Sequence, residues 1–494
     1  MKQLPGNHHN PSGWLQSRQK GTQRLNRRRF LAQVATAGAG FNLLRSGLLR
    51  AGNSPNNKLN LAIIGVGGRG RVNMNGVKVR DRGFSVQADL KGLKVENIAA
   101  LCDVNEIVLA EASKQYPEAK TYTDWRRCLD QKDLDAVVCS TADHTHAFIN
   151  VWAMNRGLNV YCEKPLANSV GEVRLVRETY LKHRNKIATQ MGIQMHSTDE
   201  LRRSVELVRR GAIGTPREVH VWCGRRPLGG SYLPESGPPP STFHWDLWIG
   251  PASFHPYNPA YLGNCLNWNR FWDFGSGQSG DMCSHMMDLA YWALDLKFPT
   301  SCRATGADFS PDTCPRWLTA EWEHPANDWR PAVKVFWYDG GKKPVFPLEI
   351  FKQIPDIERP EDGPTGPGNT DPLYKGLLFV GDEGWLLTDH NFRVMIPKNG
   401  RSDLTYYSPP KQEDLIPSSQ GHHDEWIEAC KTGKPTGANF DYSGMLVEHN
   451  LLALVAYRAG KKLEWDAAKL SATNCPEADK FIHRKYRDGW TLNG

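Results

Sequence analysis

The sequence predicts an α/β protein whose first folded domain is built on a parallel sheet. Three observations predict it: short apolar runs alternate with helical stretches from residue 58 onward, a glycine-rich turn follows the first run, and polar side chains follow the later ones. The 494 residues, 40% hydrophobic and 23% charged, suffice for two domains with extensions. This composition excludes collagen-like, coiled-coil and multi-span membrane proteins.

The positive charge of the chain is concentrated at its N-terminus. The net charge is +8, yet residues 1–50 contain nine Lys and Arg and no Asp or Glu, so the remainder is nearly neutral. Nucleic-acid-binding proteins depend on clustered Lys and Arg for their affinity. A nearly neutral body therefore argues against a nucleic-acid partner.

Residues 1–57 predict an export signal and a linker. Arg27 and Arg28 form a twin-arginine pair, and an acid-free apolar stretch follows as far as Leu44. That stretch is about 15 residues long and contains polar interruptions, whereas a membrane-spanning helix needs about 20 apolar residues. We therefore expect a twin-arginine signal, a periplasmic or otherwise exported protein, and no membrane anchor. A disordered basic tail is the alternative.

The eleven cysteines contain no C-x-x-C pair, so they give no pattern typical of a zinc site. Cys102, Cys139 and Cys162 fall in apolar runs and are expected to be buried as small hydrophobic residues. The spacing of Cys302 and Cys314 leaves a disulfide between them open.

The first apolar run, residues 58–64, predicts a strand that ends in the motif GVGGRG. In this G-x-G-x-x-G pattern, Gly65 would make the tight turn, Gly67 would let the backbone approach a pyrophosphate, and Gly70 would let the next helix pack on the sheet. The phosphates would lie at the N-terminus of that helix. The motif predicts a dinucleotide site.

The second apolar run, residues 97–103, ends in Asp103, where a ribose-binding carboxylate is expected. Such a carboxylate would repel a 2′-phosphate, so we expect NAD as the cofactor, with NADP as the alternative. Asp103 lies further from Gly70 than the roughly 20 residues of the usual fingerprint, which predicts an insertion within residues 73–96. Capping of the next helix is the other role open to Asp103.

Two further strands are predicted at residues 135–141 and 158–166, separated by a helix. Strands that alternate with helices in this way form a parallel sheet, whose functional residues gather at the carboxyl ends of the strands. Here those ends are Ser140–His146 and Glu163–Leu166.

Three motifs together resemble the Gfo/Idh/MocA oxidoreductase family: GVGGRG at 65–70, TADHTHA at 141–147 and EKPL at 163–166. The resemblance continues through FHWDLWIGPA and GDMCSHMMDLAYWALDL toward the C-terminus. It implies a Rossmann domain at residues 58–195 and a substrate-binding α/β domain with a large, mostly antiparallel sheet at 196–494, in a homo-oligomer. Residues 353–372 are rich in Pro and Gly and predict a long surface loop.

Lys164, Asp281 and His285 are the predicted catalytic residues. Lys164 precedes a proline, which favours an extended backbone and so fixes the direction of the ammonium group. Asp281 and His285 are four residues apart on a helix expected at 281–296, after a flexible glycine-rich lead-in at 275–280. The carboxylate would orient an imidazole that titrates near neutrality. A helix-capping Asp and a structural His are the alternative.

The resemblance also implies the residues that bind the cofactor and the substrate. Those expected at the cofactor are Gly65, Gly67, Gly68, Arg69, Gly70, Asp103, Thr141, His144, His146, Glu163 and Lys164. Those expected at the substrate are Lys164, Gln194, Trp272, Asp281 and His285, with the Trp272 ring suited to the apolar face of a sugar.

The other histidines are weaker candidates. His144 and His146 are expected beside the nicotinamide, and their H-x-H spacing is also found among metal ligands. We expect no metal, because hydride transfer to a nicotinamide needs no Lewis acid. His422 and His423 are expected to be surface residues.

The predicted function is the oxidation of a secondary alcohol on a sugar, cyclitol or glycoside, with NAD as the hydride acceptor. Lys164 or His285 would accept the hydroxyl proton, and Lys164 would stabilise the developing alkoxide. The enzymatic alternative is an exported glycosidase or lyase that oxidises and re-reduces its substrate with tightly bound NAD. A non-enzymatic sugar-binding protein is the third hypothesis.

Overall fold

The computed structural model describes residues 58–76, 91–347, 350, 373–398 and 407–493, all of which belong to one compact unit. The twin-arginine motif and the loop predicted at 353–372 lie outside the described residues.

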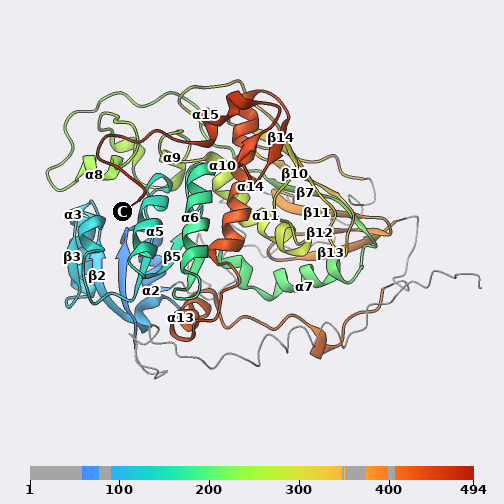
Figure 1. Ribbon diagram of the computed structural model, residues 1–494, viewed down its shortest axis with the longest axis horizontal. Helices are drawn as coiled ribbons and strands as arrows, with labels where there is room; N and C mark the ends of the chain where they lie inside the picture. The colour runs from blue at the N-terminus through green and yellow to red at the C-terminus, as the bar shows by residue number, and fades with distance from the viewer. Residues whose placement is uncertain (1–57, 77–90, 348–349, 351–372, 399–406, 494) are drawn as a thin grey trace, which may run out of the picture. The chain divides into compact units, whose positions relative to one another are not determined.

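The first sheet has six strands in the order β3-β2-β1-β4-β5-β6. The strands are β1 (Asn60–Ile64), β2 (Asn97–Cys102), β3 (Lys120–Tyr122), β4 (Ala136–Cys139), β5 (Asn159–Glu163) and β6 (Thr189–Gly192). Every pairing between them is parallel, which confirms the prediction (Figure 1, blue to green). The strand order reverses between β1 and β4, and ligands of such sheets bind at this switch point.

The first sheet is accompanied by helices that follow its strands. They are α2 (Gly68–Asn75), α3 (Glu106–Gln115), α4 (Trp125–Cys128), α5 (Asp143–Asn155) and α6 (Val170–His183). Local sequence sets where two of them begin: the Asn105 side chain accepts hydrogen bonds from the first turn of α3, and Ser169 caps α6 in the same way. Helix α5 is buried along most of its length.

The second sheet has nine strands in the order β13-β12-β11-β7-β10-β9-β8-β14-β15. Its strands are β7 (Pro216–Cys223), β8 (Ser301–Gly306), β9 (Leu318–His324), β10 (Val333–Tyr338), β11 (Lys375–Gly381), β12 (Gly384–Thr388), β13 (Arg393–Pro397), β14 (Leu463–Asp466) and β15 (Ser471–Ala472). Among these strands only the β7–β10 pairing is parallel, so the expected mostly antiparallel sheet is confirmed.

Further α-helices lie in the described chain after β6, and short 3-10 turns occupy several of the connections. The α-helices are α7 (Asp199–Arg209), α8 (Trp245–Ile249), α9 (Cys265–Trp268), α10 (Gly277–Gly280), α11 (Met282–Ala293), α13 (His422–Thr432), α14 (Phe440–Ala459) and α15 (Asp479–Ile482). The 3-10 turns are η1 (Leu93–Val95), η2 (Gln194–Ser197), η3 (Pro259–Tyr261), η5 (Gln412–Asp414) and η6 (Pro476–Ala478).

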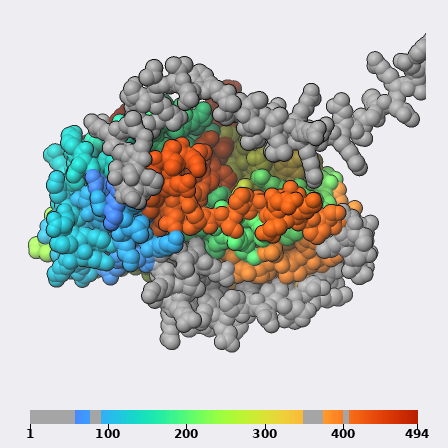
Figure 2. Space-filling model, turned by 90° about the horizontal axis from the view of Figure 1, so that it is seen from below, coloured from blue at the N-terminus to red at the C-terminus, as the bar shows by residue number. Residues whose placement is uncertain are grey.

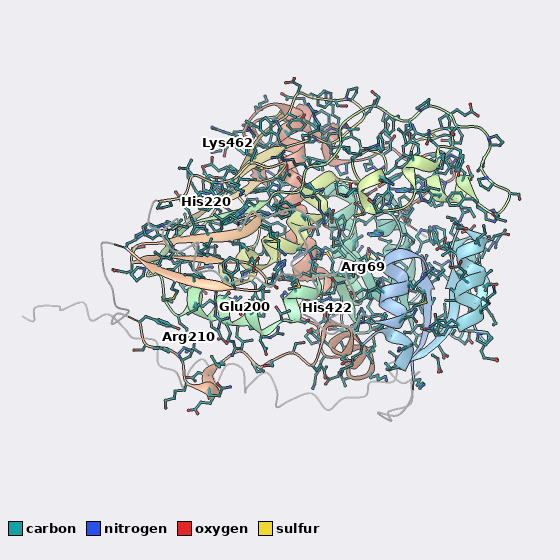
Figure 3. The ribbon with its side chains drawn as sticks, turned by 180° about the vertical axis from the view of Figure 1, so that it is seen from behind. Arg69, Glu200, Arg210, His220, His422 and Lys462 are labelled. Carbon is teal, nitrogen blue, oxygen red and sulfur yellow. The ribbon has the colours of Figure 1, made fainter. Side chains whose placement is uncertain are left out.

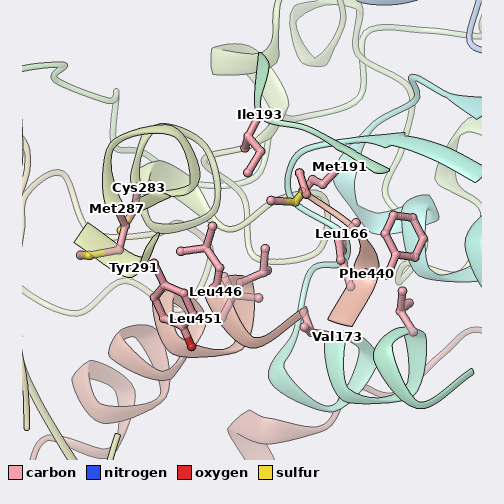
Figure 4. Close-up of a cluster of buried hydrophobic side chains, with 14 of the residues drawn as sticks. Leu166, Val173, Met191, Ile193, Cys283, Met287, Tyr291, Phe440, Leu446 and Leu451 are labelled. Atoms are coloured by element: carbon pink, nitrogen blue, oxygen red, sulfur yellow. The ribbon is translucent and has the colours of Figure 1, made fainter. Parts of the chain in front are cut away.

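Helix α14 joins the two halves of the molecule, because it packs on α6 from the first half and on β8 and α11 from the second. Figure 4 shows Leu446 and Leu451 of α14 in one buried cluster with Tyr291 of α11 and with Met191 of β6. The two sheets therefore share a hydrophobic core.

The fold corrects one expectation here, confirms a second and decides a question that the sequence left open. The glycine-rich lead-in at residues 275–280 was expected to be flexible, but it is buried and ends in α10. Its glycines allow close packing, since a Cβ on Gly280 would lie 1.9 Å from the Ser276 hydroxyl oxygen. The predicted helix follows directly as α11. All eleven cysteines are free, so Cys302 and Cys314 form no disulfide.

His422 and His423 are both buried, and not at the surface as expected, because α13 packs them against Tyr161 of β5. In Figure 2 the orange residues of the C-terminal part lie between the blue residues near the start of the first sheet and green residues from the middle of the chain. Within the described residues, no helix combines the length and the apolar character that crossing a bilayer requires.

Candidate active site

The glycine-rich turn between β1 and α2 has the geometry of a phosphate-binding loop. Gly65 has φ +83°, and a Cβ on Gly70 would lie 1.7 Å from the carbonyl oxygen of Gly65, so both positions require glycine. A Cβ on Gly68 would meet nothing within 4 Å, so the backbone there borders open space at the start of α2. These residues fit a pyrophosphate held at a helix N-terminus.

Asp103 lies at the end of β2 and is tied to this turn. Its Oδ2 accepts a hydrogen bond from the Val66 backbone N–H at 3.0 Å, and its Oδ1 accepts one from Asn105 N–H at 2.9 Å. Burial raises the pKa of the Asp103 carboxyl. Asp103 thus stands where a ribose is expected, and it also supports the turn before α3, the alternative role that the sequence left open.

Glu163, at the end of β5, is linked to two residues of α2 and to Gln194. Its Oε1 accepts hydrogen bonds from Asn73 Nδ2 at 3.0 Å and from Gln194 Nε2 at 3.2 Å, and Arg69 Nε lies 4.0 Å away. Figure 3 shows Arg69 on the side of α2 that faces the C-terminal half. Glu163 therefore fixes α2 relative to β5.

Gln194 was expected at the substrate, but its side chain is 2% exposed. Besides Glu163, its amide nitrogen donates to the Tyr161 hydroxyl at 3.0 Å. The structure thus places Gln194 in a buried polar network, because the 3-10 turn after β6 directs it inward.

The strongest cluster of charges in the predicted site surrounds Asp281. Its Oδ1 accepts a hydrogen bond from Lys164 Nζ, and its Oδ2 accepts one from Arg225 Nη1 at 2.7 Å. Asn269 Nδ2 lies 3.4 Å from the same Oδ2. Burial alone would raise the pKa of Asp281, but the two cations outweigh it and hold the pKa well below its usual range. Asp281 is therefore a permanent anion between two cations.

Lys164 is the positive centre of this cluster. Burial disfavours its charged form, yet the Asp281 carboxylate outweighs burial and raises the pKa of the ammonium. Its side chain is 14% exposed, so the group is largely shielded from water. Lys164 is protonated at neutral pH and can stabilise a negative oxygen.

His285 lies one turn into α11, on the same helix face as Asp281. Burial, followed by the Lys164 charge, lowers the pKa of His285 well below its ordinary value, so the imidazole is neutral. Its Nδ1 is buried and has no hydrogen-bond partner among the described residues. Among the described residues, Asp281 accepts hydrogen bonds from Lys164, Arg225 and Asn269. We find no hydrogen bond between Asp281 and His285 there, so the expected direct orientation of the imidazole by Asp281 is not what the structure shows.

His144 and His146 of α5 have their ring nitrogens beside backbone carbonyl groups. His144 lies 2.9 Å from Trp248 O and 3.3 Å from Phe274 O, and His146 lies 2.6 Å from Pro165 O and 3.1 Å from Thr141 O. Backbone contacts therefore occupy the polar atoms that were expected at the nicotinamide.

One group in the described residues has the proximity of metal ligands, namely Cys139, His146 and Cys162, whose ligand atoms lie within 4.8 Å of one another. His144 is not part of it, so the H-x-H pair does not converge on one point. Because both nitrogens of His146 already contact carbonyl oxygens, this group is not suited to hold a metal. Thr141, also expected at the cofactor, has its hydroxyl oxygen 2.7 Å from that of Thr145 in α5.

Trp272 lies outside this cluster. Its indole N–H donates to Ser310 O at 3.0 Å, and the Arg458 guanidinium lies 4.8 Å from its ring. The ring faces a separate cavity that Lys164, Asp281 and His285 do not line. The structure therefore does not bring Trp272 to the predicted catalytic residues.

Two residues of the cluster escaped sequence reasoning. Arg225 follows the end of β7, and an arginine pair directly after a strand was the available signal. Asp143 begins α5 within the TADHTHA run; burial raises its pKa to about 7, and its Oδ2 has no hydrogen-bond partner among the described residues. The charges of Lys164 and His146 act on Asp143 in the opposite direction and lower its pKa.

Family models match both halves of the chain. Residues 59–191 match the model described as "Oxidoreductase family, NAD-binding Rossmann fold", and residues 209–325 match "Oxidoreductase family, C-terminal alpha/beta domain". The chain belongs to the Gfo/Idh/MocA oxidoreductase family. The first domain of this family member is thus of the NAD-binding type, in agreement with the glycine turn.

Curated relatives are similar over part of the chain. A levoglucosan dehydrogenase of Pseudarthrobacter phenanthrenivorans is 25% identical over 195 residues, 39% of this chain and 42% of that protein. An inositol 2-dehydrogenase of Salmonella paratyphi B is 29% identical over 147 residues, 30% of this chain and 42% of the relative. A glycosyl hydrolase family 109 protein of Stenotrophomonas maltophilia is 32% identical over 150 residues, 28% of this chain and 29% of the relative. The chain thus aligns with less than half the length of these relatives.

Solved structures share the fold over most of the chain. A levoglucosan dehydrogenase in complex with NADH and levoglucosan has a TM-score of 0.52 at 16% identity, covering 82% of this chain and 99% of that one. The WlbA dehydrogenase of Chromobacterium violaceum, in complex with NADH and UDP-GlcNAcA, has a TM-score of 0.55 at 15% identity, covering 83% and 96%. These likenesses establish the two-domain fold.

Proposed function

We propose that this protein is an NAD-dependent dehydrogenase that oxidises a secondary alcohol of a sugar, a cyclitol or a glycoside. One observation carries the proposal: a charged Lys164, held by Asp281, lies near a neutral His285 at the end of a strand of the NAD-binding sheet. Dehydrogenases among its relatives act on levoglucosan and inositol, which supports a polyhydroxylated substrate.

The residues divide the work of alcohol oxidation. When bound, NAD takes the hydrogen and electron pair of the breaking C–H bond. Neutral His285 accepts the hydroxyl proton at an imidazole nitrogen, and the Lys164 ammonium stabilises the negative charge that develops on the oxygen. Asp281, itself bonded to Arg225, holds Lys164 in place. The substrate thereby becomes a ketone.

The glycine turn and Asp103 would hold the cofactor. The open backbone at Gly68 and the N-terminus of α2 suit the pyrophosphate, and the Asp103 carboxylate favours the unmodified ribose of NAD over that of NADP.

A second function is favoured by a specific observation, the similarity to a glycosyl hydrolase family 109 protein. In this cycle the same residues would oxidise a glycoside, allow loss of its substituent, and reduce the product with the same bound nucleotide. Stoichiometry separates the two functions. Net oxidation yields one NADH per product, whereas the cycle releases free sugar over many turnovers without added NAD and without net NADH.

The decisive experiment is to measure NADH absorbance and product together, using purified protein with levoglucosan, inositols and simple glycosides. Equal amounts of NADH and product support the dehydrogenase. Many turnovers of a glycoside on bound nucleotide alone would replace it with the cyclic mechanism.

We also propose that the protein is exported by the twin-arginine route, on the support of Arg27 and Arg28, and that it acts as a homo-oligomer, as the family resemblance suggests. Light scattering after size-exclusion chromatography would give the oligomeric state.

A further inference from the structure

A cavity of about 270 Å³ lies apart from the candidate active site. It is enclosed by the loop before α10, the start of α6, the end of α14 and the tail that follows α15. Lys164, Asp281 and His285 are not among the residues that line it. Segments distant in sequence thus converge on a space that the dehydrogenase reaction does not use.

Cations outnumber carboxylates among the charged side chains that line this cavity, and they are Arg458, Lys480, Arg484 and Lys485. The two carboxylates close to it are already engaged. Asp273 lies 2.7 Å from His255 Nε2, which also lowers the pKa of the Asp273 carboxyl against the effect of burial. Positive charge therefore remains in excess.

Glu172, the second carboxylate, is paired with Arg484, although its Oε1 has no hydrogen-bond partner among the described residues. Its Oε2 accepts the Asn168 backbone N–H at 3.0 Å, and its Oε1 lies 3.6 Å from Arg484 Nη1. Arg484 Nη2 also donates to Asp273 O at 2.7 Å. Arg484 is thus compensated, whereas Arg458, Lys480 and Lys485 have no acidic partner within the described ranges.

Arg458 is held in an unusual way for an arginine. Its guanidinium lies 4.8 Å from the Trp272 ring and 4.3 Å from the Phe481 ring. Its Nε is buried without a hydrogen-bond partner in the described part of the chain, and the same holds for the Ser276 hydroxyl. Aromatic faces orient a guanidinium and leave its N–H edge free to bind an oxyanion with two hydrogen bonds. Buried donors without partners call for such an acceptor.

We propose that this cavity binds a small oxyanion, phosphate or sulfate, either free or as a substituent of a carbohydrate. Its volume would hold about nine waters, which is enough for such an anion and part of a sugar ring. Arg458 and Ser276 donate to the anion, and Lys480 adds charge at the rim. The bound anion would connect the C-terminal tail to α10, which directly precedes Asp281.

Titration calorimetry and thermal unfolding of the full chain test this site. Both are run with saturating NAD, so that the glycine turn is filled, and with phosphate, sulfate or chloride at equal ionic strength. We expect saturable binding and a higher melting temperature with phosphate and sulfate but not with chloride. Arg458→Gln should weaken binding at least about tenfold.

Two further variants keep the test decisive. Lys480→Gln, at an exposed position, should fold normally and weaken binding about threefold, whereas Lys411→Gln, an exposed lysine beside Glu413 that does not line the cavity, should leave it unchanged. A hexose 6-phosphate that binds more tightly than phosphate identifies a carbohydrate substituent as the ligand; equal or weaker binding identifies the free anion. An anion effect that chloride reproduces, or that all variants share with the unmodified chain, overturns the proposal.

Discussion

The Lys164 ammonium donates a hydrogen bond to the Asp281 carboxylate, although the two residues are 117 positions apart. Lys164 follows β5 of the first sheet, and Asp281 directly precedes α11 beside the second. This ion pair therefore joins the NAD-binding half to the half expected to bind the substrate, and it keeps Lys164 charged, whereas burial keeps the nearby His285 neutral.

Removal of Lys164 or of His285 should stop turnover without releasing the cofactor. Lys164→Ala and His285→Ala should each lower kcat by ~10² or more, the usual scale for lost acid–base assistance. Nucleotide fluorescence should show unchanged NAD binding. Lys182→Ala and His183→Ala, at the end of α6, are the matched controls. Full activity in the Lys164 or His285 variant would contradict the proposed roles.

Arg225 should act through Asp281 as a positioning residue. Because its charge helps to hold the pKa of Asp281 low, Arg225→Gln should raise that pKa. The carboxylate of the variant then becomes protonated at a higher pH than in the unmodified chain. We expect the acidic limb of the kcat profile to move to higher pH, with Arg225→Lys restoring it in part. A uniform loss of activity at every pH would indicate a structural role instead.

The cofactor assignment depends on Gly67 and Asp103. Gly67→Val should abolish NAD binding and leave most of the fold intact, because a Cβ there would already lie 3.2 Å from Val108 Cγ1 and a larger side chain would displace the turn that is expected to hold the pyrophosphate. Asp103→Ala should weaken NAD and reduce discrimination against NADP. Calorimetric titration with both nucleotides measures this. Tighter NADP than NAD binding by the unmodified protein would show that Asp103 is wrongly assigned.

Asp143 should make stability fall as pH rises. Its pKa is about 7 in the folded chain against an ordinary value of 3.8, so the fold favours the protonated form. This contribution is complete below about pH 4 and is lost as pH rises through 7. The unfolding free energy should therefore decrease between pH 5 and 8 by about 2 to 3 kcal/mol less in Asp143→Asn than in the unmodified chain. Denaturant titrations across that range measure this difference. If Asp143 were ionised throughout, the plots of unfolding free energy against pH would be parallel for the variant and the unmodified chain, which would contradict the prediction.

The twin-arginine pair predicts dependence on one export route. Replacement of Arg27 and Arg28 by Lys should leave the protein in the cytoplasm, because these residues and the apolar stretch after them are the targeting signal found in the sequence. Cell fractionation and immunoblotting give the result. Unchanged export of the variant would remove the basis for the signal.

Local sequence patterns predicted the first strands of the NAD-binding sheet and the turns that follow them. The run before Gly65 and the run before Asp103 are strands, because apolar residues bounded by turn residues are sufficient to specify them. The pairing of Arg225 with Asp281 depends on how the two halves pack, and no spacing along the chain encodes it. The surroundings of Gln194 and Trp272 could not be predicted for the same reason, since burial and neighbouring side chains decide which way each one points.

Helix α14 limits how the substrate can enter. Because α14 packs on α6 of one half and on β8 of the other, a hinge motion between the halves would have to separate buried side chains along its length. This packing therefore opposes domain motion. As a result, the Lys164 ammonium from one half and the His285 imidazole from the other stay at a constant separation.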